Sequence, residues 1–449
     1  MAGMIIDDGG FPEGEEFGKA PTLISQVEPP VFVTEPPVLP NPRYEVGELL
    51  QTGGTGAVYR ARDRRLARDV AVKVQRLDPK RHPEAVAGYV NEARIMSYLS
   101  HPGVIPIYDS GDSEDGRPFY IMKLVEGATL LDLVNRQSAG AARLLEIFSD
   151  VCQTMAYAHS RGVVHADLKP ANIMVGEYGQ VYVMDWGLAR FPAQPVQTEN
   201  ACPIWFSWAA HQTGGVSGTP GYMSPEQARG EILDARTDVF GLGGILSEIL
   251  LGQPPYQGTT VKEIYRRALA GWIDPTLERL ENTETDRVLV ALAKKCLAPD
   301  REQRPPDGKA VAREIARYQE FTLQQAESDM NRFFELSLDL FCIADFEGYF
   351  RRINGNFHRI LGHSEADLMS RPFLEFVHSE DQQETIDCMS VLREGQPVVR
   401  FQNRYRTATG DYLRLEWTAK AIESEGLIFA VARDVSDVRK AKACLHSYS

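Results

Sequence analysis

Two neighbouring segments decide the fold: VVHADLKPANIMV at residues 163–175 and VYVMDWGLAR at residues 181–190. In both, polar residues lie between or directly after apolar, strand-like runs. The Tyr178–Gly179 pair between the segments is a turn signal, so a β-hairpin can bring Asp167 and Asp185 close together. The sequence therefore predicts one polar site built from both segments.

These segments contain the groups that phosphoryl transfer requires. The reaction needs a carboxylate that orients the attacking hydroxyl, oxygen ligands for Mg²⁺ and a cation near the transferred phosphate. Asp167 can supply the carboxylate and Lys169 the cation. Asn172 and Asp185 can supply the metal ligands. The alternative is that these are ordinary polar residues of strand-capping loops, which would account for either segment alone.

A glycine cluster and a lysine-bearing strand upstream strengthen this interpretation. The cluster is LLQTGGTGAVY at 49–59, whose glycines let backbone N–H groups approach phosphate oxygens closely. In VAVKV at 70–74, Lys73 stands among apolar residues, which is costly unless the lysine meets anions. Glu92, within a predicted helix at 84–99, can pair with Lys73.

In these motifs the sequence resembles the Hanks-type (eukaryotic-like) protein kinases, from about Tyr44 to Tyr318. TGGTGAV is similar to their glycine-rich loop, VAVK to their lysine strand, HADLKPAN to their catalytic loop and DWG to their metal-binding motif. Later motifs agree, and they are GTPGYMSPE (218–226) at the end of the activation segment, DVFGLGG (238–244) and Arg304 in REQRP. Lys169 together with Thr219 resembles the serine/threonine branch of the family.

The resemblance implies ATP as the phosphate donor, with Mg²⁺ or alternatively Mn²⁺, and serine or threonine hydroxyls of substrate proteins as acceptors. The catalytic residues that it implies are Asp167 and Lys169, and the metal ligands are Asn172 and Asp185. The implied nucleotide contacts are Leu50, Gln51, Thr52, Gly53, Gly54, Thr55, Gly56, Ala57, Val58, Ala71, Lys73, Glu92, Met122, Val125 and Met174.

The sequence departs from the family pattern at three positions. Gln51 stands where the first loop glycine usually lies, Trp186 replaces a phenylalanine, and Ala166 replaces the arginine before the catalytic aspartate. None of the three removes a group that touches ATP or metal, so we expect an active enzyme. If Trp186 is buried, its indole N–H needs a hydrogen-bond partner. Without an arginine at 166, we expect activity to depend little on phosphorylation of the activation segment.

Two other function classes stay open. A pseudokinase-like signalling scaffold is suggested by Gln51 and Ala166, and a small-molecule kinase of similar fold is disfavoured by a GTPGYMSPE platform that resembles a peptide-substrate surface. The activation segment also carries IWFSW (204–208), which packs on the kinase's own surface or engages a partner. Its candidate phosphorylation sites are Thr198, Thr213 and Ser217.

The C-terminal part of the chain returns to strands after a long helix predicted at 308–337. Two strands turned at Glu347–Gly348, then helices, then three strands form the predicted order. With ADFEGYFRRIN, GHSEADL, FVHSED and RDVS, this order resembles a PAS domain over about 333–440, which implies a sensor or interaction module. A homodimer through the connector helix or the PAS domain, including a coiled coil, is an open alternative.

We assign no cofactor to the PAS domain. Cys342 lacks the surroundings of the flavin-reactive cysteine of light-sensing relatives, so we interpret it as a small core residue. His358, His363 and His378 are the candidate haem ligands, but surface or capping roles fit them better.

The fold class is therefore α+β, a bilobal protein-kinase fold followed by a PAS fold with a five-stranded antiparallel sheet and helices. A β-rich lobe precedes a helical lobe, with helices predicted at 144–162, 237–252 and 285–298. The predicted domains are a disordered proline-rich arm (1–42), a kinase domain (43–320), a helical connector (321–332), a PAS domain (333–440) and a tail (441–449).

The overall composition narrows the partners and the compartment. The formal net charge of −14 argues against nucleic acid and anionic membranes as partners, because both attract a basic face. Six scattered cysteines with no CxxC pair indicate reduced thiols. The acidic N-terminus is unlike a secretory signal, and no apolar run is long enough for a membrane span, so we expect a cytoplasmic protein.

Overall fold

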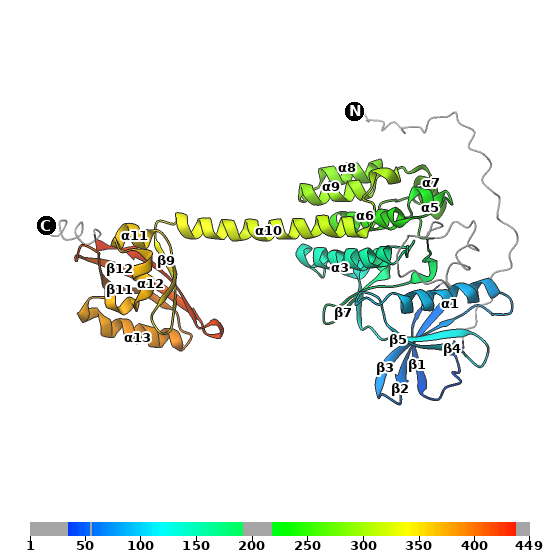
Figure 1. Cartoon of the computed structure of the whole chain (residues 1–449), viewed down its shortest axis with the longest axis horizontal. Coiled ribbons are helices and arrows are strands. Elements are labelled where there is room, and N and C mark those ends of the chain that lie inside the picture. Colours follow the sequence, from blue (N-terminus) through cyan, green and yellow to red (C-terminus); the bar gives the residue numbers. More distant parts are fainter. Residues whose placement is uncertain (1–34, 54–55, 192–217, 437–449) are drawn as a thin grey trace, which may run out of the picture. The chain divides into compact units, whose positions relative to one another are not determined.

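The computed structural model describes residues 35–53, 56–191 and 218–436 (Figure 1). By internal contacts the chain divides after Tyr318 into two compact units. Some of the predictions concern residues outside the described ranges. These residues are 1–34 of the proline-rich arm, Gly54, Thr55, the 192–217 part of the activation segment with Thr198, IWFSW, Thr213 and Ser217, and 437–449.

The first unit begins with a five-stranded antiparallel sheet in the order β1-β2-β3-β5-β4. Val70, Val72 and Val74 of β3 are fully buried in its core. Helix α1 (Pro83–Tyr98) packs against β4 and β5 and begins at a proline, which suits a first helical position. The strands are β1 (Tyr44–Thr52), β2 (Gly56–Asp63), β3 (Arg68–Gln75), β4 (Ile107–Asp112) and β5 (Pro118–Lys123).

Helices dominate the rest of this unit, as the sequence predicts. Helix α6 lies at the centre: its residues 237–248 are all buried, and it packs against α3 and α9. The helices are α2 (Leu130–Asn135), α3 (Ala141–Ser160), α5 (Pro225–Ala228), α6 (Ala235–Leu251), α7 (Val261–Ala270), α8 (Asp274–Asn282) and α9 (Arg287–Cys296).

The predicted hairpin at Tyr178–Gly179 is present. It joins β7 (Ile173–Gly176) to β8 (Val181–Val183), and Gly179 has φ +86°, a left-handed conformation that glycine adopts without strain. Strand β6 (Gly127–Thr129) completes a three-stranded sheet with them. This small sheet presents the two polar segments on either side of the hairpin.

Helix α10 (Gly308–Leu336) is continuous across the division between the units, close to the helix predicted at 308–337. Its first turns bury Val311, Ala312 and Ile315 in the core of the first unit. The expected connector, residues 321–332, lies within this helix. The domain boundaries themselves remain predictions.

The second unit is a five-stranded antiparallel sheet in the order β10-β9-β13-β12-β11 with helices packed on it. Helix α13 packs against β11 and β12, and Phe350, Phe357 and Trp417 form an aromatic core. These two sheets and their helices confirm the predicted α+β fold. The elements are β9 (Leu340–Asp345), β10 (Phe350–Ile353), α11 (Asn356–Leu361), α12 (Glu365–Ser370), α13 (Gln382–Arg393), β11 (Val398–Arg406), β12 (Tyr412–Ile422) and β13 (Leu427–Asp434).

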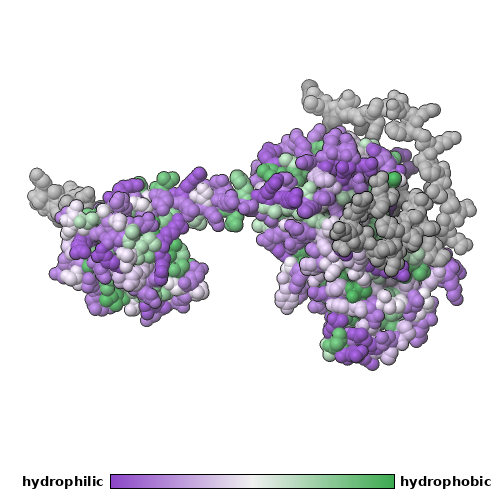
Figure 2. Space-filling model, in the orientation of Figure 1, coloured by the Kyte–Doolittle hydropathy of each residue, from purple (hydrophilic) through white to green (hydrophobic). Residues whose placement is uncertain are grey.

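Hydrophilic residues cover most of the visible surface of each unit, with apolar residues scattered among them (Figure 2). Among the helices of the described ranges, none combines the length and the apolar character needed to cross a membrane.

Candidate active site

The lysine of β3 meets its expected anions. Lys73 Nζ lies 2.7 and 2.9 Å from the two carboxylate oxygens of Glu92 on α1, and 3.9 Å from Asp185 Oδ1. Burial alone would lower the pKa of Lys73, but the negative charges of Glu92 and Asp185 raise it above its ordinary value. The lysine is therefore charged, and it is held beside the metal-binding candidate Asp185.

The glycine-rich hairpin lies next to this lysine. Strand register places Val58 opposite Lys73 and Thr52 opposite Ala57, and Gly53 N–H donates to Gly56 O at 2.8 Å. A Cβ on Gly56 would lie 3.3 Å from Lys73 Cε, so glycine lets the hairpin sit closely over the lysine. Gly54 and Thr55, at the tip, lie outside the described residues.

The remaining expected nucleotide contacts fall into two groups. Leu50, Gln51 and Thr52 are exposed on β1, whereas Ala57 and Ala71 are buried on β2 and β3. The second group is partly buried and packs against the large apolar core of the first unit. Its members are Met122 on β5, Val125 between β5 and β6, and Met174 on β7. Met122 is paired with Ala71 across β5 and β3.

Asp167 is the centre of a hydrogen-bond cluster. Its Oδ2 accepts from Lys169 Nζ at 2.6 Å and from Asn172 Nδ2 at 3.1 Å. Its Oδ1 accepts from the backbone N–H and the hydroxyl of Thr219, at 3.0 and 2.9 Å. Lys169 also donates to Thr219 Oγ1 at 2.5 Å. The carboxylate, the cation and the end of the activation segment therefore meet at one point.

Asn172 and Asp185 offer oxygen atoms of the kind that Mg²⁺ prefers. Asn172 uses its Nδ2 donors on the backbone oxygen and the carboxylate of Asp167, at 2.8 and 3.1 Å, which leaves its Oδ1 free to bind a cation. The Asp185 side chain is 53% exposed, so its carboxylate is accessible. The donor set of these two residues therefore fits a divalent metal held by oxygen.

Trp186 is fully buried, and its indole N–H donates to Val183 O at 3.1 Å. This bond supplies the partner that the sequence required of a buried indole. The His165 ring lies 4.6 Å from the indole, and its Nε2 donates to Met184 O at 2.9 Å. The tryptophan thus fixes the turn that carries Asp185.

Two residues beside the reacting groups have left-handed backbones. Ala166 has φ +63° and Asp185 has φ +59°, conformations that are strained for residues other than glycine. The Asp238 carboxylate of α6 stabilises the Ala166 conformation, because it accepts hydrogen bonds from His165 N at 2.7 Å and from Ala166 N at 2.8 Å. Gln227 Nε2 donates to Ala166 O at 2.6 Å on the other side.

Two further contacts fix the segment that carries Thr219 and Gln227. The Ser224 side chain caps the N-terminus of α5. Glu226 then forms a buried two-bond ion pair with Arg304, at 2.7 and 2.9 Å. This pair ties the end of the activation segment to the loop after α9.

Sequence reasoning missed three supporting residues, namely Gln227, His159 and Arg190. Gln227 and His159 act through contacts with distant residues, for which the sequence carries no local signal. Arg190 lies beside the catalytic segment, because its backbone bridges Val164 with two hydrogen bonds of 2.9 Å. Burial lowers the pKa of Arg190, and the Asp238 charge opposes that shift.

Comparison with known proteins agrees with this geometry. The protein kinase domain model matches residues 44–317, which is more than half of the chain. The chain belongs to the protein kinase family. A PAS fold model also matches residues 350–431. Membership of the protein kinase family implies the use of ATP and a divalent metal.

Bacterial serine/threonine-protein kinases are among the relatives of this kinase. PknB of Mycolicibacterium smegmatis is 42% identical over 259 residues, covering 56% of this chain and 40% of the relative. PknB of Mycobacterium leprae is 40% identical over 277 residues, covering 61% of this chain and 42% of the relative. PknD of Protochlamydia amoebophila is 33% identical over 296 residues, covering 62% of this chain and 30% of the relative. The chain thus spans less than half the length of these relatives.

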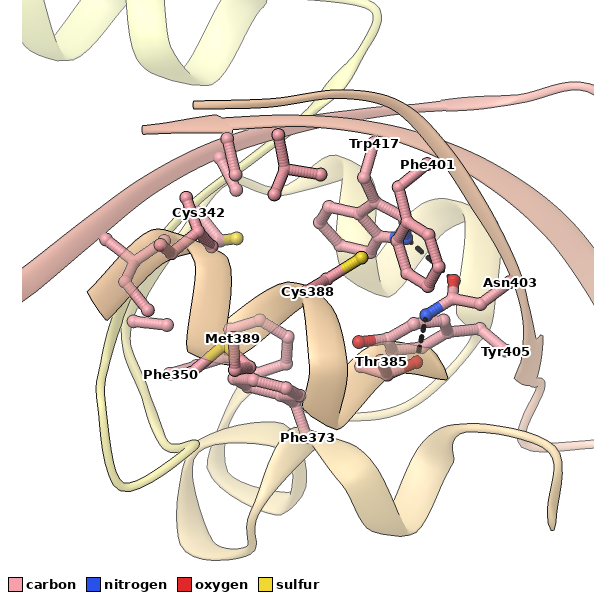
Figure 3. Close-up of a pocket in the computed structure, with 16 residues that line it drawn as sticks. Cys342, Phe350, Phe373, Thr385, Cys388, Met389, Phe401, Asn403, Tyr405 and Trp417 are labelled. Atoms are coloured by element: carbon pink, nitrogen blue, oxygen red, sulfur yellow. Dashed lines mark hydrogen bonds between the residues drawn. The ribbon is translucent and has the colours of Figure 1, made fainter. Parts of the chain in front are cut away.

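The PAS unit contains a cavity of about 70 Å³ (Figure 3). Aromatic and sulfur-containing side chains surround it, including Phe350, Phe401 and Met389. At its polar end, Asn403 accepts from Trp417 Nε1 at 2.8 Å and donates to Thr385 Oγ1 at 3.2 Å. The described residues that line the cavity include no charged side chain.

The PAS residues singled out from the sequence lie as follows. Cys342 lines the cavity, and burial raises the pKa of its thiol, so it packs as a small uncharged core residue. The three histidines lie away from the described cavity lining. His358 bonds to His363 O at 2.8 Å, His363 bonds to Arg406 O at 2.9 Å, and His378 accepts from Glu380 N at 3.3 Å.

Proposed function

We propose that this chain is a serine/threonine protein kinase that transfers the γ-phosphate of ATP to hydroxyls of substrate proteins. The observation that carries the proposal is the pair of contacts that Lys73 Nζ makes with Glu92 at 2.7 Å and with Asp185 at 3.9 Å. This arrangement brings the strand lysine and the metal-binding candidate together without any movement of α1. Relatives named serine/threonine-protein kinases over the same region support the substrate class.

ATP with a divalent ion, Mg²⁺ or alternatively Mn²⁺, supplies the transferable phosphoryl group when it is bound. Lys73 neutralises phosphate oxygens, while Asn172 and Asp185 hold the ion. Asp167 orients the attacking hydroxyl and accepts its proton, and Lys169 balances negative charge on the transferred group. We propose Met122, Val125, Met174, Ala71 and the glycine-rich hairpin as the contacts to the base and phosphates.

Thr219 has a distinct part in this scheme. Its hydroxyl donates to Asp167 Oδ1 and accepts from Lys169 Nζ, so it fixes the two groups that act on the hydroxyl substrate. A hydroxyl-bearing residue that approaches Asp167 would do so beside Thr219, at the end of the activation segment. This position suits a protein substrate laid over residues 218–226.

The test of the chemistry uses three active-site substitutions. Asp167→Asn and Asp185→Asn should each lower the rate of phosphate transfer to a generic protein substrate by about 10²–10⁴-fold. Lys73→Ala should do likewise, because it leaves Glu92 and the phosphates unpaired. Asp112→Asn, on exposed β4, is the matched control and should keep full activity.

The outcomes separate the alternatives. Substantial activity of Asp167→Asn would contradict the role of that carboxylate. A wild-type chain that binds nucleotide without turnover would favour the pseudokinase scaffold. Transfer to a small acceptor, with none to protein, would favour a small-molecule kinase.

We further propose that the PAS domain biases the kinase between more and less active states through α10. The helix has no break between Gly308 and Leu336, and a stiff connector transmits a shift that a flexible one would absorb. Coupling of about 1–3 kcal/mol corresponds to roughly 5–150-fold in activity. Initial rates of the full chain, residues 1–325 and a variant with a Gly-Ser insertion near Gln324 test it. Equal rates, with and without cell extract to supply a ligand, would leave the PAS domain as a docking module.

A second copy of the chain is the partner that we propose for the connector. Leu323, Met330 and Phe333 of α10 are 62%, 66% and 68% exposed, and their spacing places them on one side of the helix. Large apolar side chains in such a row are expected to be covered in a dimer. Light scattering should give the mass of a dimer for the full chain and of a monomer for a Leu323→Glu, Met330→Glu variant. A monomeric wild-type chain would contradict this proposal.

A further inference from the structure

The first residue of α10 contacts the last turn of α3, from which the chain enters the catalytic segment. Gly308 N–H donates to His159 Nδ1 at 2.9 Å. A Cβ at Gly308 would lie 2.9 Å from the backbone nitrogen of Ala156 and 3.0 Å from the carbonyl carbon of Met155. Both atoms belong to the rigid backbone of α3, so the start of α10 is seated directly on that helix.

The His159 ring passes this contact on to α6. Its Nε2 lies 2.9 Å from Asp238 Oδ2, and the two side chains are 3% and 1% exposed. Because the backbone N–H of Gly308 can only donate, Nδ1 must carry the lone pair and Nε2 the proton. The ring therefore acts as a neutral bridge that accepts from α10 and donates to Asp238.

Asp238 holds the backbone that precedes the catalytic carboxylate. The oxygen that accepts from His159 also accepts from His165 N at 2.7 Å, and the other accepts from Ala166 N at 2.8 Å. Ala166 is in a left-handed conformation at φ +63°, which persists only where its surroundings enforce it. Asp167 follows directly, so its position depends on these two bonds.

We propose that His159 is a positioning residue that links the start of α10 to the catalytic segment. A displacement of α10 lengthens the hydrogen bond between Gly308 and His159 and turns the His159 ring. Asp238 then loses the hydrogen bond that it accepts from His159. Its hold on the Ala166 backbone weakens, so Ala166 relaxes and Asp167 moves. All the residues of this relay belong to the first unit, while the far end of the same helix belongs to the second. The inference rests on the proposed kinase function and gives the route by which α10 acts.

The test measures kcat and KM for ATP in the full chain. His159→Phe, which removes both ring bonds, should lower kcat at least tenfold and change the KM for ATP less than twofold, because Lys73 and Glu92 are untouched. His159→Gln, whose side-chain amide can still donate toward Asp238, should recover part of the loss. Gly308→Ala should reproduce the loss by pushing α10 off α3. Gly140→Ala is the matched control, since a Cβ there meets nothing within 4 Å.

The link to α10 is tested by a double-mutant cycle. A Gly-Ser insertion near Gln324 should change kcat in the wild-type background and have at most a twofold effect in His159→Phe. An equal fold-change in both backgrounds overturns the relay, as does an unchanged kcat in His159→Phe and Gly308→Ala. If His159→Phe fails to fold, Gly308→Ala carries the same comparison. A wild-type chain without activity would instead refute the proposed function, so the two failures are distinguishable.

Discussion

Removing the Arg304 guanidinium should destabilise the kinase domain strongly without affecting the PAS domain. Its five N–H donors all have acceptors: two go to Glu226, and the others go to the backbone oxygens of Arg236, Ala298 and Pro299. The side chains of Arg304 and Glu226 are 0% and 4% exposed. Arg304→Ala therefore leaves a buried carboxylate without its cation and removes one hydrogen-bond donor from each of three backbone carbonyls.

Breaking one side of such a buried pair costs about 3–5 kcal/mol. For domains near this size, 1 kcal/mol shifts the melting temperature by about 2–4 °C. We therefore expect the kinase transition of Arg304→Ala to fall by about 6–20 °C in differential scanning calorimetry. The PAS transition of the same chain should stay in place and acts as an internal control.

The matched control is the exposed pair of Arg317 and Glu314, 3.2 Å apart, whose side chains are 73% and 49% exposed. Arg317→Ala should change stability by no more than about 0.5 kcal/mol, because solvent already screens that pair. Equal falls in the melting temperature of the kinase domain in Arg304→Ala and Arg317→Ala would refute this reasoning. Burial would then not be the reason that the pair of Arg304 and Glu226 stabilises the fold.

The same pair predicts a pH dependence. Burial alone would raise the pKa of Glu226, but the hydrogen bonds and charge of Arg304 hold it below its ordinary value. A carboxyl group with a lowered folded-state pKa stabilises the fold above its unfolded pKa and loses that contribution as the pH falls. The gap between wild type and Arg304→Ala should therefore narrow in acid. A gap that widens in acid would contradict this assignment.

Three further predictions concern other parts of the chain. Phosphatase treatment should lower the initial rate less than about tenfold, or ~1.4 kcal/mol in the barrier, because alanine precedes the catalytic aspartate; a larger loss would point to Arg190 as a phosphate-binding residue. Burial raises the pKa of Glu248, so Glu248→Gln should raise the melting temperature at neutral pH, with a gain that shrinks as the pH falls; a gain that grows in acid would refute this. Asn403→Ala leaves Trp417 and Thr385 without their shared hydrogen-bond partner and should lower the free energy of unfolding of the PAS domain alone by about 1–3 kcal/mol. An unchanged melting temperature of the PAS domain would contradict the importance of this network.

Local signals in the sequence were enough for most of the fold. Glycine at 179 and 348 predicts two of the hairpins, β7–β8 and β9–β10, and both residues have positive φ in the structure. The helix expected at 308–337 runs from Gly308 to Leu336 because neither glycine nor proline interrupts it. The boundaries of α3 were less predictable. It begins at Ala141, three residues before the expected start, because Gly140 adopts the extended conformation of an N-cap.

The reacting groups were also predictable, because their types and order are specific to the chemistry. What the sequence could not provide is the set of contacts that hold them. Trp186 required a partner, but only the fold identifies it as Val183 O. His159 and Gln227 are ordinary helix residues in the sequence. They acquire their roles because Asp238 of α6 and Gln227 both bond to the backbone of Ala166, while the start of α10 bonds to His159, which contacts Asp238.

The most direct test of the central claim is the fate of the γ-phosphate of ATP. The full chain is incubated with Mg²⁺ and ATP labelled in that phosphate, beside Asp167→Asn, and the label is followed into protein by phosphoamino-acid analysis. The account predicts label on serine and threonine with the wild-type chain, and at most about 1% of it with Asp167→Asn. Label on neither residue, or equal label with both proteins, would contradict it.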